Sequence, residues 1–186
     1  MARKLVSWGV TIAAAIAFVL VFEVEIAQPY RIPSASMEPT LQCAKPGPAC
    51  TARYNDRVIA AKIVYRFRNP ERGEIAVFTA PPAARRDCDE GGTFVKRVIG
   101  LPGEVVGERD GYVTIDGKPL SEPYISPAAR DHLTKTWPRL GPGEYFVMGD
   151  NRSDSCDSRV WGPVARSAFI GPVVATYWPP TRWSIP

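Results

Sequence analysis

The chain has 186 residues and a formal net charge of +4, from 23 basic and 19 acidic residues. This length allows one domain, or one domain with a small appendage. So mild a basic excess, without a long basic run, argues against nucleic-acid binding but is compatible with contact to anionic lipid headgroups. Nineteen prolines and fifteen glycines argue against a helical bundle and favour short strands joined by turns.

An uncharged apolar run occupies residues 5–22. As a helix it would span about 27 Å, close to a hydrocarbon core of about 30 Å. Arg3 and Lys4 precede the run, which places the N-terminus in the cytoplasm and the rest outside. A buried core helix would carry a polar face, and a cleaved signal would have a small residue in place of Glu25. The sequence therefore predicts a stub and single transmembrane anchor over residues 1–27 and an extracytoplasmic domain over 28–186.

A serine-containing octapeptide follows the anchor. Residues 24–33 are expected to be extended, because two prolines exclude helix there. Residues 34–41 then read Ser-Ala-Ser-Met-Glu-Pro-Thr-Leu. A serine hydroxyl is a poor nucleophile unless a neighbouring base takes its proton. The octapeptide therefore indicates chemistry only together with a base further along the chain.

The cysteines are four in number: Cys43, Cys50, Cys88 and Cys156. An even count outside the cytoplasm suggests disulfides. Cys43 and Cys50 flank a turn-rich loop that could bring them together, which would leave Cys88 to pair with Cys156. Four cysteines allow three connectivities, and spacing does not choose among them. A zinc site is the rival interpretation, but the chain has no Cys-x-x-Cys pair and a single histidine.

The remainder of the chain predicts a compact, mainly β domain. Residues 56–65 fit a strand or a short helix, whereas residues 79–92 and 126–143 have the composition of loops. Asp-Gly turns at 110–111 and 116–117 predict a hairpin or meander within 104–143, which we expect to form a small inserted β-lobe. The strongest strand candidates are residues 74–78, 94–99, 113–115, 145–148 and 173–178.

The search for a base leads away from histidine. His132 lies in a proline-rich loop with polar neighbours, so a solvated side chain is expected and a Ser-His-Asp triad is not. A lysine can serve instead, since burial can lower its pKa by up to about 3–5 units. Strand alternation puts Lys96 on the same face as Phe94 and Val98, with Arg97 opposite. The alternative is a partly exposed lysine whose stem covers the edge of the core.

A third segment favours the interpretation of Lys96 as a buried base over that of a partly exposed lysine. Residues 148–162 read Met-Gly-Asp-Asn-Arg-Ser-Asp-Ser-Cys-Asp-Ser-Arg-Val-Trp-Gly, which is too polar and specific for a generic turn. It resembles the Gly-Asp-Asn-x-x-x-Ser-x-Asp-Ser-Arg segment of the bacterial type I signal peptidase (leader peptidase) family. Residues 96–103 resemble that family's lysine segment, Ser36-Met37 its serine segment, and residues 72–78 the strand between them. The resemblance covers nearly the whole chain, in the expected order.

The resemblance implies a role for each matching position. Ser36 would be the acylated nucleophile and Lys96 the general base, as in a Ser-Lys dyad. Ser155 would orient the lysine amine. The hydroxyl of Ser34 and the backbone N–H of Ser36 would form the oxyanion hole. Asp157 and Arg159 would support the site as an ion pair, and no chemistry is assigned to Gly149, Asp150 or Asn151.

The resemblance also implies a fold and a function. The fold would be an antiparallel β fold with a short second lobe. The activity would be that of a serine endopeptidase in the cell membrane, which removes N-terminal signal peptides from exported preproteins after small residues. No metal or cofactor would be needed. Partners would be preproteins, membrane lipid and, as a further candidate, the secretion translocon, but not nucleic acid.

One departure from the family is Cys156, where a small residue such as alanine is common. A disulfide to Cys88 would clamp the Ser155 loop, whereas a free thiol would make activity redox-sensitive.

Three alternatives to a general signal peptidase share some of these sequence features. A specialised maturation peptidase of the same superfamily, acting on a pilin-like or conjugation substrate, fits the same residues. Self-cleaving repressors share Ser-Lys chemistry, but the N-terminal anchor argues against them. A non-catalytic anchored β-module is disfavoured by the intact Ser36, Lys96 and Ser155.

Overall fold

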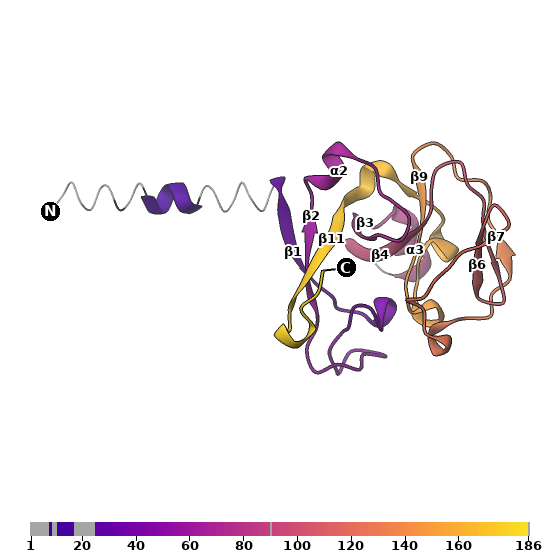
Figure 1. Cartoon of the computed structure of the whole chain (residues 1–186), viewed down its shortest axis with the longest axis horizontal. Coiled ribbons are helices and arrows are strands. Elements are labelled where there is room, and N and C mark those ends of the chain that lie inside the picture. The colour runs from indigo at the N-terminus through magenta and orange to yellow at the C-terminus, as the bar shows by residue number, and fades with distance from the viewer. Residues whose placement is uncertain (1–7, 9–10, 17–24, 90, 186) are drawn as a thin grey trace.

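The computed structural model describes residues 8, 11–16, 25–89 and 91–185. Residues 11–16 are helical and lie away from a β-rich body (Figure 1). Among the described residues, no helix is both long enough and apolar enough to cross a bilayer. Most of the predicted anchor at residues 5–22 lies outside the described residues.

The body is built on a seven-stranded antiparallel sheet (Figure 1) with the order β1-β2-β11-β3-β4-β9-β10. Its strands are β1 (Ala27–Arg31), β2 (Arg57–Ala61), β3 (Ile75–Thr79), β4 (Thr93–Gly100), β9 (Glu144–Met148), β10 (Val164–Ala165) and β11 (Phe169–Trp178). Each predicted strand outside residues 104–143 is present, and β11 begins four residues before the predicted Val173. Pro29 is tolerated in β1 because that strand lies at the edge of the sheet, where a missing N–H costs least.

A smaller four-stranded sheet lies within residues 104–143, with the order β7-β6-β5-β8. Its strands are β5 (Val106–Arg109), β6 (Tyr112–Ile115), β7 (Lys118–Pro119) and β8 (Lys135–Thr136). The two Asp-Gly turns connect β5 to β6 and β6 to β7. Asp110 and Gly111 have φ of 47° and 76°, and Asp116 and Gly117 have φ of 48° and 78°. Both pairs adopt the left-handed conformation that a two-residue type I′ hairpin turn requires, as the Asp-Gly pairs predict.

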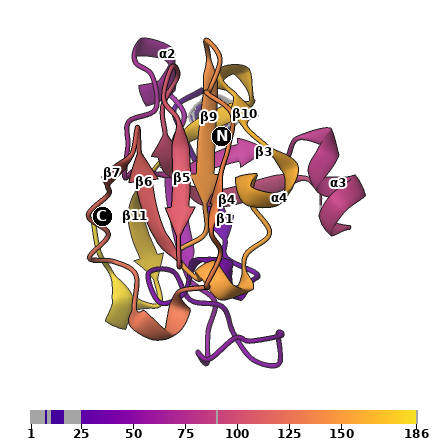
Figure 2. The same cartoon turned by 90° about the vertical axis from the view of Figure 1, so that its right-hand side faces the viewer.

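Two segments predicted as loops contain regular structure. Residues 79–92 include helix α3 (Pro82–Cys88), which projects from the side of the body (Figure 2). Pro82 stands at the first helical position, where its missing N–H costs nothing, and the fully buried Ala84 packs into the core. Residues 126–143 include β8, which forms because it pairs with β5. Both predictions were wrong because the contacts that stabilise these elements come from distant parts of the chain.

The other helices are short. Residues 56–65 contain both elements that their composition allowed, since β2 is followed by helix α2 (Val64–Phe67). Helix α4 (Ser158–Trp161) follows the polar segment. Single 3₁₀ turns span Ala35–Met37, Pro127–Ala129, Arg152–Asp154, Arg166–Ala168 and Pro180–Arg182.

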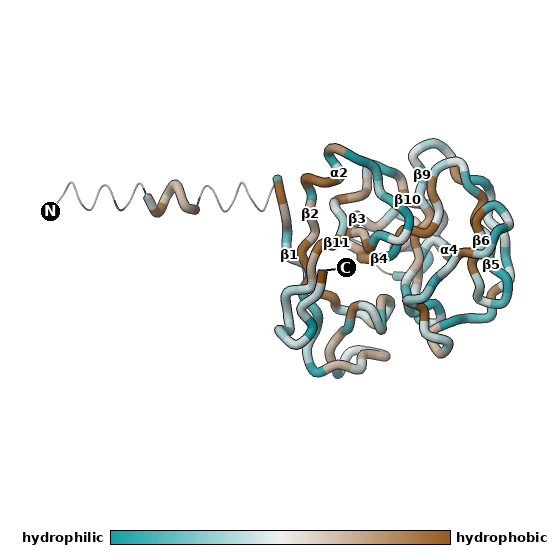
Figure 3. The backbone as a smooth tube through the Cα atoms, in the orientation of Figure 1, coloured by the Kyte–Doolittle hydropathy of each residue, from teal (hydrophilic) through white to brown (hydrophobic). Residues whose placement is uncertain are grey.

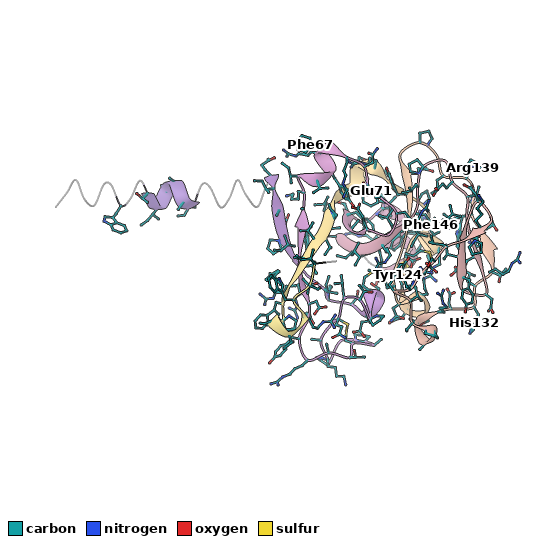
Figure 4. All side chains as sticks on the ribbon, viewed as in Figure 1. Phe67, Glu71, Tyr124, His132, Arg139 and Phe146 are labelled. Atoms are coloured by element: carbon teal, nitrogen blue, oxygen red, sulfur yellow. A yellow bond between two sulfur atoms is a disulfide. The ribbon has the colours of Figure 1, made fainter. Side chains whose placement is uncertain are left out.

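Strand β4 connects the apolar clusters of the body and the second lobe. Val98 packs with Phe78 and Trp161 in one cluster. Its neighbour Ile99 packs with Phe146 in the cluster beneath the second lobe. Figure 3 shows the inner strands in brown and the connection after α2 in teal, and Figure 4 places Phe146 inside the molecule. The lysine-bearing strand therefore has little freedom to shift, since both sides of it are packed.

Gly100, the last residue of β4, tests this packing. A Cβ added there would lie 2.5 Å from Val106 Cγ2 and 2.9 Å from both Leu140 Cδ1 and Phe146 Cβ. Gly100→Ala is therefore expected to lower the free energy of unfolding by about 2 kcal/mol through overpacking. Urea denaturation measures this, with Gly91→Ala as an exposed control that changes stability by less than about 0.5 kcal/mol. Equal stability of the two variants would contradict this account of the joint between the sheets.

Candidate active site

The octapeptide at residues 34–41 forms a single 3₁₀ turn, Ala35–Met37, directly after the extended segment that continues β1. Ala35 and Met37 are almost fully buried, at 3% and 1% exposed, and Met37 belongs to the apolar cluster around Val58 and Val77. Ser34 is exposed and Ser36 is half-buried between these anchors. Their hydroxyl oxygens lie 3.3 Å apart. The turn thus buries its apolar residues and presents two serine hydroxyls side by side.

The turn is held by the polar segment that follows β9. Asn151 donates its backbone N–H to the carbonyl of Ser36 (3.1 Å) and its side-chain amide to the carbonyl of Ala35 (3.2 Å). Asp150 accepts a hydrogen bond from the Thr40 hydroxyl at 2.6 Å. Asn151 therefore fixes the backbone around Ser36, and Asp150 binds the Thr40 side chain of the same octapeptide, although the sequence assigned no chemistry to either residue.

Asp150 is also half of a buried ion pair. The guanidinium of Arg97 donates to both of its oxygens, at 2.8 Å from Nε and 2.6 Å from Nη2. Arg97 also stacks on Tyr124, with Cζ 3.9 Å from the ring centroid (Figure 4 labels Tyr124). The sequence predicted that Arg97 lies on the strand face opposite Lys96, but it did not identify Asp150 as the ion-pair partner of Arg97. The signal that could have suggested it was an arginine and an aspartate inside the two most specific motifs.

Lys96 lies in β4 and is 4% exposed, so the expectation of a buried lysine on the inner face is confirmed. Its Nζ is 5.9 Å from the ring centroid of Phe94. Lys96 and Ser36 line the same cavity, of about 300 Å³, together with Ser34. The apolar part of its wall comes from Ile32, Met37, Phe94 and Val95. A lysine from β4 and a serine from the Ala35–Met37 turn, far apart in sequence, thus share one largely apolar space.

Ser155 approaches Ser36 across Gly149. A Cβ added to Gly149 would lie 2.3 Å from Ser155 Oγ and 2.3 Å from the carbonyl oxygen of Ser36. Only glycine fits between them. The Ser155 hydroxyl donates to Asp157 Oδ2 at 2.8 Å, and the N–H of Gly149 donates to the same oxygen at 3.0 Å.

Asp157 is completely buried and caps helix α4 by accepting the N–H of Arg159. Arg159 also donates from Nε to Oδ1 at 2.9 Å and from Nη2 to Oδ2 at 2.8 Å. Burial by itself would raise the pKa of Asp157. The hydrogen bonds and charge of Arg159, together with the charge of Lys96, nevertheless hold that pKa below its usual range. Asp157 is therefore a fixed negative charge within electrostatic reach of Lys96.

Two disulfides lie next to these segments. The structure joins Cys43 to Cys50 and Cys88 to Cys156, and it contains no free cysteine among the described residues. The second bridge ties the end of α3 to the residue that follows Ser155. The first bridge closes the loop after the octapeptide. Just beyond that loop, the Thr51 hydroxyl donates to the carboxylate of Glu38, within the octapeptide, at 2.9 Å.

His132 lies apart from this constellation. Its side chain is 89% exposed, with Nδ1 2.9 Å from Asp110 Oδ1, and Figure 4 shows it at the outer edge of the second lobe. The described residues also contain no cluster of histidine, cysteine or carboxylate side chains that could hold a metal ion. The groups that come together are two serines, a buried lysine and a third serine, an arrangement suited to nucleophilic acyl transfer.

One titratable group lies behind the site. Glu108 on β5 is 4% exposed. Its pKa is raised to about 7, mainly by burial and to a smaller extent by the negative charge of Asp131. The positive charges of Arg159 and Arg152 act in the opposite direction. The carboxyl group is therefore neutral in mildly acidic solution and ionises near neutral pH.

Comparison with known proteins supports one family. The family described as "Signal peptidase, peptidase S26" matches residues 5–178 of this chain. A probable signal peptidase I-2 from Synechocystis is 40% identical over 175 residues, which cover 94% of this chain and 73% of that protein. A signal peptidase I from Leptolyngbya laminosa is also 40% identical, over 92% of this chain and 79% of that protein. A crystal structure of a signal peptidase I from Enterococcus faecalis has 34% sequence identity and a TM-score of 0.47, covering 57% of this chain and 97% of that one.

Glu108 gives a prediction about stability. A carboxyl group whose folded-state pKa is raised favours folding at low pH and loses that contribution as pH rises through about 7. Glu108→Gln cannot ionise. We expect its free energy of unfolding to fall less than that of the wild type between pH 5 and pH 8, by about 1–2 kcal/mol after allowance for solvent screening. Denaturation at both pH values measures the difference, and identical pH dependence of the two proteins would contradict it.

Proposed function

The chain belongs to the signal peptidase S26 family, and on that premise we propose that it is a serine endopeptidase that cleaves signal peptides from exported preproteins. The observation that carries the proposal is the cavity that Ser36 shares with the buried Lys96, with Ser155 held close to Ser36 across Gly149. The relatives' printed names and the spacing of the three motifs support the same activity.

In the proposed mechanism, neutral Lys96 takes the proton of the Ser36 hydroxyl as the oxygen attacks the scissile carbonyl carbon. The carbonyl oxygen becomes an oxyanion, which the Ser36 N–H and the Ser34 hydroxyl stabilise. The position of the Ser34 hydroxyl, 3.3 Å from Ser36 Oγ, supports this role. The ammonium of Lys96 then protonates the leaving amine. Lys96 next deprotonates a water molecule, which hydrolyses the ester at Ser36.

Ser155 is proposed to aim the amine. Its hydroxyl proton is committed to Asp157 at 2.8 Å, so its oxygen can act only as an acceptor toward Lys96. An amine that donates one N–H to Ser155 directs its lone pair elsewhere, toward the serine that it must deprotonate. Asp157 and Arg159 are proposed to keep Ser155 in that orientation.

The substrate is proposed to bind as an added strand. Residues 93–96 of β4 pair with β3 along one edge, whereas pairing with β9 along the other edge begins only at Arg97. The cavity lies between this open edge and the extended residues 30–34. An extended peptide placed there could hydrogen-bond to β4 through its main chain and present alternate side chains to the cavity. A volume of about 300 Å³, shared with catalytic groups, favours small side chains next to the scissile bond.

The membrane location is proposed on sequence grounds. The uncharged run at residues 5–22 has the length and flanking charges of a cytoplasm-to-outside anchor, and the match to the family begins at residue 5. An anchor would hold the catalytic domain at the bilayer surface, where a signal peptide's cleavage site emerges while its apolar part is still in lipid. Membrane lipid and the secretion translocon are accordingly proposed as its surroundings.

Cleavage of a preprotein tests the activity. Ser36→Ala removes the nucleophile and Lys96→Arg keeps a positive charge that cannot deprotonate, so each should lower kcat/KM by at least about 10⁴-fold. Wild-type activity should fall with decreasing pH, because protonation of the lysine removes the base. Electrophoresis of the processed product measures cleavage. Ser167→Ala and Lys118→Ala, both at exposed positions away from these segments, are matched controls that retain full activity. Undiminished cleavage by either active-site variant would refute the mechanism.

Gly149→Ala tests the geometry instead of the reacting groups. The new methyl group would overlap the Ser36 carbonyl and the Ser155 hydroxyl, and the backbone carbonyl cannot simply rotate away. We expect kcat to fall by about 10²-fold, the size of effect that a displacement of about 1 Å produces. Gly141→Ala, which meets only the flexible Glu144 side chain, is the control. Steady-state kinetics in which both variants match the wild type would show that the close approach is not required.

A further inference from the structure

Two arginines of the polar segment are buried beneath the candidate site. The side chains of Arg152 and Arg159 are 0% and 6% exposed. A guanidinium stays charged at any physiological pH, and a buried charge is tolerated only when it is paired and hydrogen-bonded. The acidic partners of these two arginines therefore decide whether the segment can hold its conformation.

The second lobe supplies partners to both arginines. Glu122, with a side chain 1% exposed, forms an ion pair with Arg152 through both carboxylate oxygens. Asp131 forms an ion pair with Nη1 of Arg159. Between these two acids lies the 3₁₀ turn Pro127–Ala129, and Arg130, just before Asp131, binds Glu122 at 3.3 Å. One short stretch of the lobe thus contacts both arginines.

The same arginines bracket the backbone that carries Ser155. Arg152 donates from Nε to the carbonyl of Gly149 at 3.1 Å. Nη2 of Arg159 donates to the carbonyl of Arg152 at 2.8 Å and to that of Ser155 at 3.3 Å. The Gly149–Ser155 backbone is therefore fixed from beneath by two guanidiniums, and their outer ends are fixed by the second lobe.

We propose that Glu122 and Asp131 are positioning residues for the reaction, through which the second lobe clamps the loop that aims the lysine amine. This inference rests on the proposed function, because it gives the lobe a task in the same active site. Neither acid lines the cavity with Ser36 and Lys96. Their effect passes through the guanidiniums of Arg152 and Arg159 to the backbone of the loop. From Arg159 it also reaches the Ser155 hydroxyl through the carboxylate of Asp157.

The geometry also predicts how the two acids differ. Arg159 keeps two hydrogen bonds to Asp157 if Asp131 is neutralised. The ion pair of Arg152 is with Glu122 alone among the described residues. Loss of the charge at Glu122 should consequently have the larger effect on the loop.

The experiment uses the full-length chain and four variants: Glu122→Gln, Asp131→Asn, the charge-retaining Asp131→Glu and the control Asp110→Asn. Asp110 lies in the same lobe, is 72% exposed and pairs only with His132 among the described residues. Cleavage of a preprotein is measured together with titration of Ser36 by a serine-reactive phosphonate, so that kcat refers to folded, reactive sites. We expect kcat to be about tenfold lower in Asp131→Asn and lower still in Glu122→Gln, with KM within twofold and full titration.

A second measurement does not depend on activity. Amide hydrogen exchange of residues 149–161 should be about tenfold faster in both lobe variants than in Asp110→Asn, with β3 unchanged as an internal reference. Asp131→Glu, which restores the charge, should recover most of both the kcat and the protection.

The outcomes separate the two proposals. If the wild type fails to cleave but the loop exchange responds as expected, the clamp stands and the proposed function falls. If the wild type cleaves and the lobe variants match Asp110→Asn in kcat and exchange, the clamp is refuted. A loss of activity that is fully matched by a loss of titratable Ser36 would likewise overturn it, because the acids would then only support folding.

Discussion

The close approach of two backbone turns at Gly149 is the constraint on which the rest of the structure depends. One turn carries Ser36, the other carries Ser155, and a single added methyl group would overlap both. Because no side chain separates the turns, their positions must be set by groups around them. The hydrogen bonds from Asn151 to the serine turn and the packing of Met37 provide this on one side. The turns that carry Ser36 and Ser155 are thus brought together by direct backbone contact.

On the other side the turns are held by buried charge. Asp150 binds Arg97 from the lysine strand and Thr40 from the serine segment, and Asp157 binds Arg159 within its own loop. Buried ion pairs of this kind contribute little net stability, because desolvation offsets most of the attraction. They do penalise any conformation that leaves one charge unpaired. A site in which a lysine must point at a serine benefits more from such restriction than from added stability.

The sequence predicted the chemistry more fully than the contacts that support it. The β class and the Asp-Gly turns follow from local patterns, whereas the three motifs together pointed to the correct family and to a buried Lys96. Helix α3 was missed because its formation depends on Ala84 reaching a distant core. The pairing of Asp150 with Arg97 and of Glu122 with Arg152 was also missed. Those partners are 53 and 30 residues apart, and no local pattern specifies which buried charge meets which.

The most direct test of the account is the identity of the residue that carries the acyl group during turnover. The protein would be quenched in acid while it processes a preprotein, digested, and mapped by mass spectrometry. The account predicts that the added mass, equal to the released signal peptide less one water, lies on Ser36 and disappears in Lys96→Arg. An acyl group on another residue, or one on Ser36 that persists in Lys96→Arg, would contradict a Ser-Lys mechanism at this site.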